Sequence, residues 1–248
     1  HWFSEYKACI NPPSILSYCV LRRKDVFYSL EIELFFEAVE ENEKALGGDG
    51  CLLVEKKLIM NELAAKIYEK SLSSSYKARS RERKKSSKKR LKSYFDYCYK
   101  ILGNNSRLLV VNIDFHYKKD FSNGISEMEA KRHRDEILEY VKNTEGYLGY
   151  ICKLEEGLKK GIHMHLLVMM NGHRRKSSYT LVREWGEYWT STVTGGIGYY
   201  YDCQAGHPMY AWRNVGKVYY ANKETIDKLK RAISYLTKPD QFLLVKRN

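Results

Sequence analysis

The chain has 248 residues, of which 44% are hydrophobic, enough for one large domain or one domain with an accessory region. Its formal net charge of +13 and its 21 tyrosines favour a polyanionic partner, most often a nucleic acid, over charge that serves solubility alone. We find no signal peptide and no apolar run near the ~18 residues of a membrane helix, so we expect no membrane partner. Six cysteines without a CxxC pair predict reduced thiols in a cytoplasmic protein. The first residue is His1 rather than a methionine, which is consistent with a fragment.

Residues 1–106 are expected to form a mostly helical accessory region with no assignable chemistry. The stretches 29–46 and 58–72 have the composition of helices. A basic run from residue 77 to residue 92 then carries ten Lys or Arg and one Glu. This run is either a solvated helix or linker, or a surface that contacts nucleic-acid phosphates. In the second case the candidate DNA-binding residues are Lys84, Lys85, Lys88, Lys89 and Arg90.

Residues 107–248 predict an α+β domain in which a strand, a helix and two more strands follow one another. The helix is expected to begin after Ser126, because Glu129 completes a capping-box pattern, and to reach Val141. A charged hairpin loop, 154–161, is expected to join the last two strands as antiparallel neighbours. The strands are predicted from runs of apolar and β-branched residues at 107–117, 147–153 and 161–170.

The rest of the chain predicts a basic turn, two helices and two short strands. Arg174 and Arg175 in the turn are further candidates for contacts with DNA. Trp185 and Trp189 lie four residues apart on one helix face and are predicted to be core residues rather than a stacking platform. The helices are expected at 178–194 and 223–238, and the strands within 199–220.

His163 and His165 carry the strongest chemical signal in the sequence. They lie two residues apart in an apolar strand, so their side chains point to the same face. Two imidazoles and one carboxylate on such a face would bind a divalent ion and leave coordination positions open. The alternative is a pair of histidines that serves packing alone.

The third ligand is expected just upstream of these histidines. Glu155 and Glu156 lie across the expected hairpin, so one of them faces the histidines and the other faces away. The expected loop between them leaves both open as ligands. Asp114 and His116, on the neighbouring strand, are candidates to support the ligands or to add a fourth contact.

The helix at 223–238 carries a candidate nucleophile. Tyr235 and Lys238 are three residues apart and therefore share a face. A tyrosine hydroxyl is a poor nucleophile unless a lysine or a metal ion stabilises its charged form. A tyrosinate attacking a phosphodiester would form a phosphotyrosine link and release a 3′-hydroxyl. The alternative is that Tyr235 is one of many tyrosines that pack a helix face.

These motifs together resemble the HUH endonucleases, which nick single-stranded DNA at replication origins. A tyrosine that follows the histidines in sequence is similar to the arrangement in the replication-initiator branch. The likeness is closest to the initiators of filamentous phages and prophages (inoviruses), and it covers about residues 106–248. It is carried by the stretches Leu108–Tyr117, Gly161–His173, Glu184–Trp189 and Ile233–Lys238.

The resemblance implies a fold and a role for each motif residue. The fold would be an antiparallel sheet of about five strands with helices packed against it. His163 and His165 would bind Mg²⁺ or Mn²⁺, Tyr235 would be the nucleophile and Lys238 its helper. The family's acidic ligand corresponds best to Glu155, eight residues before His163, or to Glu156 in relatives that place it seven before. Some relatives have a second catalytic tyrosine four residues away, but positions 231 and 239 are Arg and Pro.

We therefore expect a site-specific DNA endonuclease and ligase that initiates rolling-circle replication of a phage or mobile element in the cytoplasm of its host. The chain has no P-loop, so a host helicase would separate the strands. A second strand transfer would need a second subunit, which makes a dimer an expectation as well. The alternatives are an HUH transposase or other nickase, a non-catalytic nucleic-acid-binding protein and, more distantly, an iron oxygenase.

Overall fold

The structure is a computed structural model that describes residues 65, 67–122, 124–157, 161–203, 215–237 and 244–247, with only the backbone at 156, 157 and 244–247. The chain divides into two compact units, His1–Lys85 and Ser86–Asn248. The expected helix 29–46 and most of 58–72 lie outside the described residues. Residues 67–72 are helical, and the basic run lies in the long helix α6, Ser74–Asn105, which continues into the second unit.

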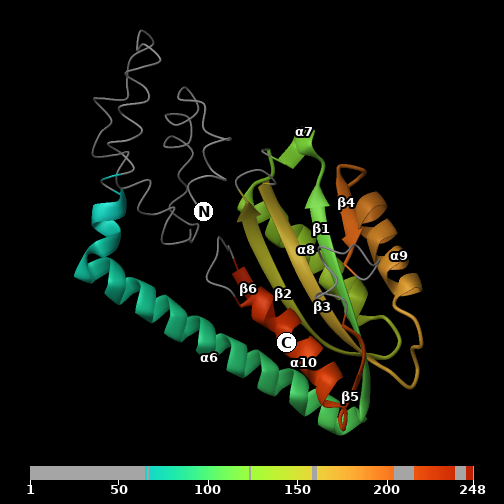
Figure 1. The fold of residues 1–248 in the computed structure, drawn as a ribbon. Helices are drawn as coiled ribbons and strands as arrows, with labels where there is room; N and C mark the ends of the chain where they lie inside the picture. The colour runs from blue at the N-terminus through green and yellow to red at the C-terminus, as the bar shows by residue number, and fades with distance from the viewer. Residues whose placement is uncertain are drawn as a thin grey trace. The chain divides into compact units, whose positions relative to one another are not determined.

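The second unit is built on an antiparallel sheet in the order β4-β1-β3-β2-β6, with β5 paired to β1 on the same edge as β4 (Figure 1). This confirms the predicted α+β fold with five strand positions, helices against the sheet and helix in the N-terminal region. The two short strands at the edge pair with the two ends of β1. The strands are β1 Arg107–Tyr117, β2 Tyr147–Gly157, β3 Gly161–Asn171, β4 Gly198–Asp202, β5 Gly216–Tyr219 and β6 Leu244–Arg247.

Helices cover both faces of this sheet. The Ser126 hydroxyl caps one of them by accepting a hydrogen bond from the Glu129 backbone N–H, as the capping pattern predicted. Asn222 caps another by accepting from the Thr225 N–H. The helices beyond α6 are α7 Lys119–Ser122, α8 Glu127–Lys142, α9 Tyr179–Tyr188, the π-helix η1 Trp189–Val193 and α10 Lys223–Leu236.

The back face of the sheet, which carries Phe115 and Tyr117 of β1, is covered by α8, α9 and η1. Trp185 and Trp189 are buried, as predicted for core residues. The Trp189 ring packs on Phe115 with centroids 4.9 Å apart, and its indole N–H donates to the His116 carbonyl oxygen at 3.2 Å. This face is therefore a continuous hydrophobic layer with few polar groups.

The front face changes character along the strands. Its first half is apolar and lies beneath α10 and the C-terminal part of α6, where Cys98, Leu102 and Ile233 are fully buried. The Ser87 hydroxyl of α6 donates to the carbonyl oxygen of Thr237 at 2.7 Å, which satisfies an acceptor at the C-terminal end of α10. Along β1 the front-face residues then become polar at Asn112, beyond the cover of α10.

Two predicted boundaries were wrong. The expected loop at 154–161 is strand as far as Gly157, because the β2–β3 ladder continues to the pair Gly157–Gly161. The helix expected at 178–194 ends as α-helix at Tyr188 and continues as the π-helix η1. The final helix, α10, ends at Leu236.

Candidate metal centre and nucleophile

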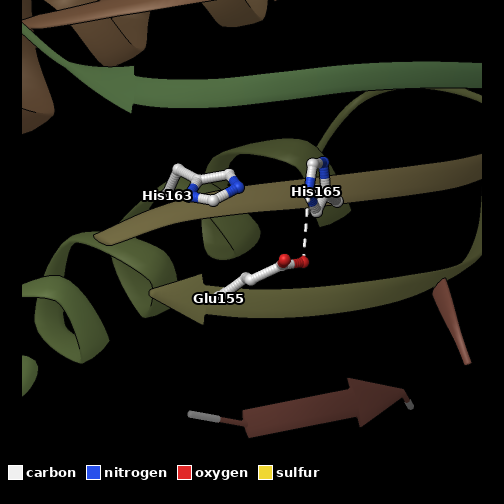
Figure 2. Close-up of side chains that lie close together, drawn as sticks. All are labelled: Glu155, His163 and His165. Atoms are coloured by element: carbon white, nitrogen blue, oxygen red, sulfur yellow. Dashed lines mark ion pairs between the residues drawn. The ribbon is translucent and has the colours of Figure 1, made fainter. Parts of the chain in front are cut away.

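Three strands bring acidic, basic and histidine side chains together on the polar half of the front face. In the β2–β3 ladder, Glu155 is paired with His163, and Lys153 with His165. In the β1–β3 ladder, Asp114 is paired with His165. Residues directly opposite each other in antiparallel strands share a face, so these side chains meet. Figure 2 shows Glu155 on β2 reaching toward His165 on β3, with His163 beside it.

The register also separates the two candidate glutamates. Glu155 is paired with His163, whereas Glu156 is paired with Ile162. Among the side chains that the structure describes, the group able to hold a metal ion consists of Glu155, His163 and His165. The geometry therefore favours Glu155 over Glu156 as the third ligand.

The donor set fits a divalent cation. The ligand atoms of Glu155, His163 and His165 all lie within 4.8 Å of one another. Two ligands of one Mg²⁺ or Mn²⁺ ion can be at most ~4.2 Å apart, at ~2.1 Å from the ion, so binding would draw these side chains slightly inward. Two nitrogens and one carboxylate suit several divalent ions, and three ligands leave coordination positions for a substrate.

Hydrogen bonds fix how the two imidazoles are turned. The His165 Nδ1–H donates to Asp114 Oδ1 at 2.7 Å, and the His163 Nδ1–H donates to the Gly161 carbonyl oxygen at 3.1 Å. Both acceptors are oxygens, so each Nδ1 carries the proton and each Nε2 is the nitrogen available to a metal. In His165 this Nε2 lies 3.4 Å from Glu155 Oε2. Asp114 thus has the supporting position expected of it.

Gly161 holds the carbonyl that orients His163. Its φ is +61°, in the left-handed region that favours glycine. A Cβ at this position would lie 2.7 Å from the Ser122 carbonyl oxygen, a backbone atom that cannot move away cheaply. The sequence Gly-Ile-His therefore needs its glycine both for the backbone conformation and for the close approach of α7.

The charges of the group are strongly coupled. Burial would raise the pKa of Glu155, but its hydrogen bond with His165 and the charges of Lys153 and the histidines lower it to about 2. Burial would likewise lower the pKa of His165, but Asp114 and then Glu155 raise it above its usual value. Burial and the nearby charge of His165 lower the pKa of His163 to about 4. Near neutral pH, His163 is therefore neutral and ready to bind a metal, whereas His165 must give up a proton.

Lys153 is a site residue that the sequence analysis did not single out. Its side chain is 1% exposed, and its ammonium lies 2.8 Å from Glu155 Oε2. A lysine is almost never buried without a partner. The available signal was its position two residues before Glu155, which places both side chains on the same face of β2.

Tyr235 lies directly beside the histidines. It is half-buried on α10, and its ring meets the His165 ring edge-to-face with centroids 5.3 Å apart and planes at 81°. The helix is held over the sheet by its buried residues Leu229, Ile233 and Leu236. The structure thus brings together the tyrosine and the two histidines that the sequence singled out. Lys238, the predicted helper of Tyr235, lies outside the described residues.

His116 contacts the metal-capable group through its ring face. It stacks on His163 with centroids 5.2 Å apart and planes within 8° of parallel. His116 is buried and comes from β1, the neighbouring strand. It therefore supports a ligand, as the sequence allowed, and lies outside the three-residue group itself.

The candidate DNA-binding residues lie away from this group. On α6, Lys84, Lys85, Lys88 and Lys89 are exposed and Arg90 is half-buried. Arg174 and Arg175 follow the opposite end of β3, roughly 25 Å from His163 at ~3.3 Å per strand residue. Arg175 donates to the Glu145 carbonyl oxygen at 2.9 Å, and both arginines pair with the Glu145 carboxylate. Arg175 therefore has a structural role in closing this turn.

Comparison of the chain with protein-family models, with curated proteins and with solved structures finds no match. None of the helices in the described part of the chain combines the length and the apolar character needed to span a bilayer.

Proposed function

We propose that this protein nicks and rejoins single-stranded DNA through a covalent 5′-phosphotyrosine intermediate, and that this reaction initiates rolling-circle replication of a phage or mobile element. One observation carries the proposal: the Tyr235 ring lies 5.3 Å from the His165 ring, beside the group of Glu155, His163 and His165. A tyrosine next to metal ligands is the pair of groups that phosphodiester attack requires.

In the proposed reaction the Tyr235 oxygen attacks the scissile phosphorus. The bond between phosphorus and the 3′-oxygen breaks, the tyrosine proton passes to the leaving oxygen, and a free 3′-hydroxyl results. Joining is the reverse reaction with a 3′-hydroxyl as the nucleophile. Atoms and charge balance without any further reactant, so the energy of the phosphodiester is stored in the protein–DNA link.

The chain's own residues would position the metal and the phosphate. A Mg²⁺ or Mn²⁺ ion bound by Glu155, His163 and His165 would polarise the phosphate and help to neutralise its charge. Asp114 would hold His165 with Nε2 toward the ion, and Gly161 would do the same for His163. The ammonium of Lys153, buried beside Glu155, adds positive potential where a phosphate would lie.

The proposed substrate also fits the charge of the surface. The exposed lysines of α6 would contact DNA phosphates, an interaction that depends on salt and not on sequence. Since the chain has one tyrosine in α10, a second strand transfer would use a second subunit. A host helicase is the proposed partner for strand separation.

Adduct formation tests the proposal. The protein would be incubated with Mn²⁺ and a pool of single-stranded oligonucleotides with a randomised centre and a fluorescein on the 3′ end, because Tyr235 would retain the 3′ fragment. A fluorescent protein band on a denaturing gel is expected, and it should disappear with EDTA or in Tyr235→Phe. Sequencing the captured strands would identify the target.

Tyr140→Phe is a matched control for that assay. Tyr140 is a tyrosine of α8, away from the metal-capable group, and donates a hydrogen bond to Glu184. Its variant should form the adduct like the unmodified protein. An adduct that persists in Tyr235→Phe would refute the role of Tyr235, and binding without any adduct would indicate a non-catalytic nucleic-acid-binding protein.

A further inference from the structure

A row of aromatic rings leads from the metal-capable group to the edge of the sheet. Tyr199 of β4 is paired with His116 of β1, and their rings stack with centroids 5.1 Å apart and planes at 14°. His116 stacks in turn on His163, at 5.2 Å and 8°. The Tyr199 ring therefore lies at most about 10 Å from the ring of a metal ligand.

Tyr199 is the exposed end of this row. Its exposed fraction is 42%, compared with 5% for His116 and 6% for His163. One face of the Tyr199 ring is covered by His116, so the ring can offer only its other face to a ligand. A flat aromatic group stacked there would continue the row in nearly the same orientation.

Positive charge lies at the same end of the sheet. Lys118 and Lys119 follow β1 directly and are exposed. The Lys118 N–H donates to the Ile197 carbonyl oxygen at 2.9 Å, which ties the end of β1 to the start of β4. Figure 1 shows α7 and β4 at this end, and Phe121 of α7 is a second exposed ring there, at 47%. Exposed rings flanked by cations are the means by which proteins hold single-stranded nucleic acids.

We propose that Tyr199 is a stacking platform for a nucleobase of a single strand, that Lys118 and Lys119 bind adjoining phosphates, and that this track leads the strand to His163 and Tyr235. The inference rests on the proposed function, because it assigns the substrate path of the same site. At ~3.4 Å per stacked nucleotide, the base on Tyr199 would be within about three nucleotides of the phosphate at the metal-capable group.

Fluorescence anisotropy with two strands of equal length would test the platform. One strand is oligothymidylate and the other consists of abasic sites, which keep the phosphates but remove the bases. Tyr199→Ala of the full chain is expected to bind oligothymidylate roughly 5- to 100-fold more weakly and the abasic strand unchanged. Tyr199→Phe keeps the ring and should bind both strands normally. Tyr179→Ala, at a tyrosine of α9 that is 64% exposed, is the matched control.

The lysines predict a different response. Lys118→Ala combined with Lys119→Ala should weaken both strands equally and make the slope of log affinity against log salt shallower by about 1.4, or ~0.7 per phosphate. If Tyr199→Ala binds both strands normally, or loses both equally, the platform is refuted. Thermal unfolding near that of the unmodified protein would show that the variant is folded.

The adduct assay separates this inference from the proposed function. Tyr235→Phe should still prefer oligothymidylate over the abasic strand. A preference that depends on Tyr199 without any adduct would refute the nuclease and leave the platform standing. Adducts with no dependence on Tyr199 would refute the platform alone.

Discussion

The sheet carries a histidine–tyrosine pair on each face, and the two pairs have different neighbours. On the back face, the Tyr117 hydroxyl and His133 Nδ1 hydrogen-bond to each other at 2.9 Å, and both residues are buried. Trp189 packs edge-on against His133. On the front face, Tyr235 meets His165 through ring contact, while the nitrogens of His165 face two carboxylates.

The difference in neighbours gives the two pairs different chemistry. Burial raises the pKa of Tyr117, and burial followed by the charge of Arg132 lowers the pKa of His133, so both stay neutral and serve packing. On the front face the carboxylates raise the pKa of His165. Histidine and tyrosine side by side are thus not enough for a site; acidic groups within reach of the imidazole distinguish the two pairs.

The largest effect is expected from removing a front-face histidine. His163→Ala should weaken Mn²⁺ binding more than 100-fold, because even loss of a group that only supports a ligand costs 10–100-fold. The rise in melting temperature on adding Mn²⁺ should vanish, and so should the adduct. His133→Ala should alter stability and leave the Mn²⁺ response intact; a lost response in both variants would remove the distinction between the faces.

Lys153→Met should destabilise the metal-free protein by about 3 kcal/mol. The substitution leaves the buried Glu155 carboxylate without its nearest cation, and breaking such a pair from one side is costly. Urea unfolding would measure the loss. Adding Mn²⁺ should recover part of it, because the ion returns positive charge to Glu155. Unchanged stability without metal would contradict the importance of this ion pair.

Asp114→Asn should weaken Mn²⁺ binding by 10–100-fold, less than loss of a ligand. The asparagine keeps the size of the side chain but removes the charge that holds His165 Nδ1–H. Calorimetric titration would measure the affinity. Asp135→Asn is the matched control, since Asp135 pairs with Arg134 on α8. Equal affinities in the two variants would count against Asp114 as a supporting group.

The smallest effect concerns pH and the back face. Because the pKa of His133 is lower in the folded protein than its usual 6.5, the unfolded chain binds more protons in this range. The contribution of His133 to stability is therefore present above pH 6.5 and declines as the pH falls below it. Urea unfolding at several pH values should show this decline in the unmodified protein and a shallower one in His133→Gln. A slope that does not depend on His133 would refute the assignment.

Local patterns predicted much of this molecule. The apolar run from Arg107 to Tyr117 is one strand, as expected, and the alternation of side chains placed His163 and His165 on one face. The charged residues Glu155 and Glu156 suggested a loop instead of strand. Pairing with β3 overrode that local preference, and the Lys153–Glu155 ion pair compensates for the burial of charge.

The remaining features depend on tertiary packing. Nothing in the sequence around Tyr235 states where α10 crosses the sheet; that position follows from apolar contacts with α6 and the front face. The burial of Lys153 also became visible only when its partner strand was known, since a single lysine in a strand is usually exposed. The stacking of Tyr199 on His116 needed the pairing of β4 with β1.

The order of the strands also has a consequence for hydrogen exchange. The ligands lie on β2 and β3, and each of these strands has a neighbour on both sides. Their amides should therefore exchange only when the whole sheet opens, whereas α10 can open without breaking any hydrogen bond between strands. The metal-capable group would then be a fixed reference point in the molecule, and Tyr235 would be the part that moves between attack and release of a DNA end.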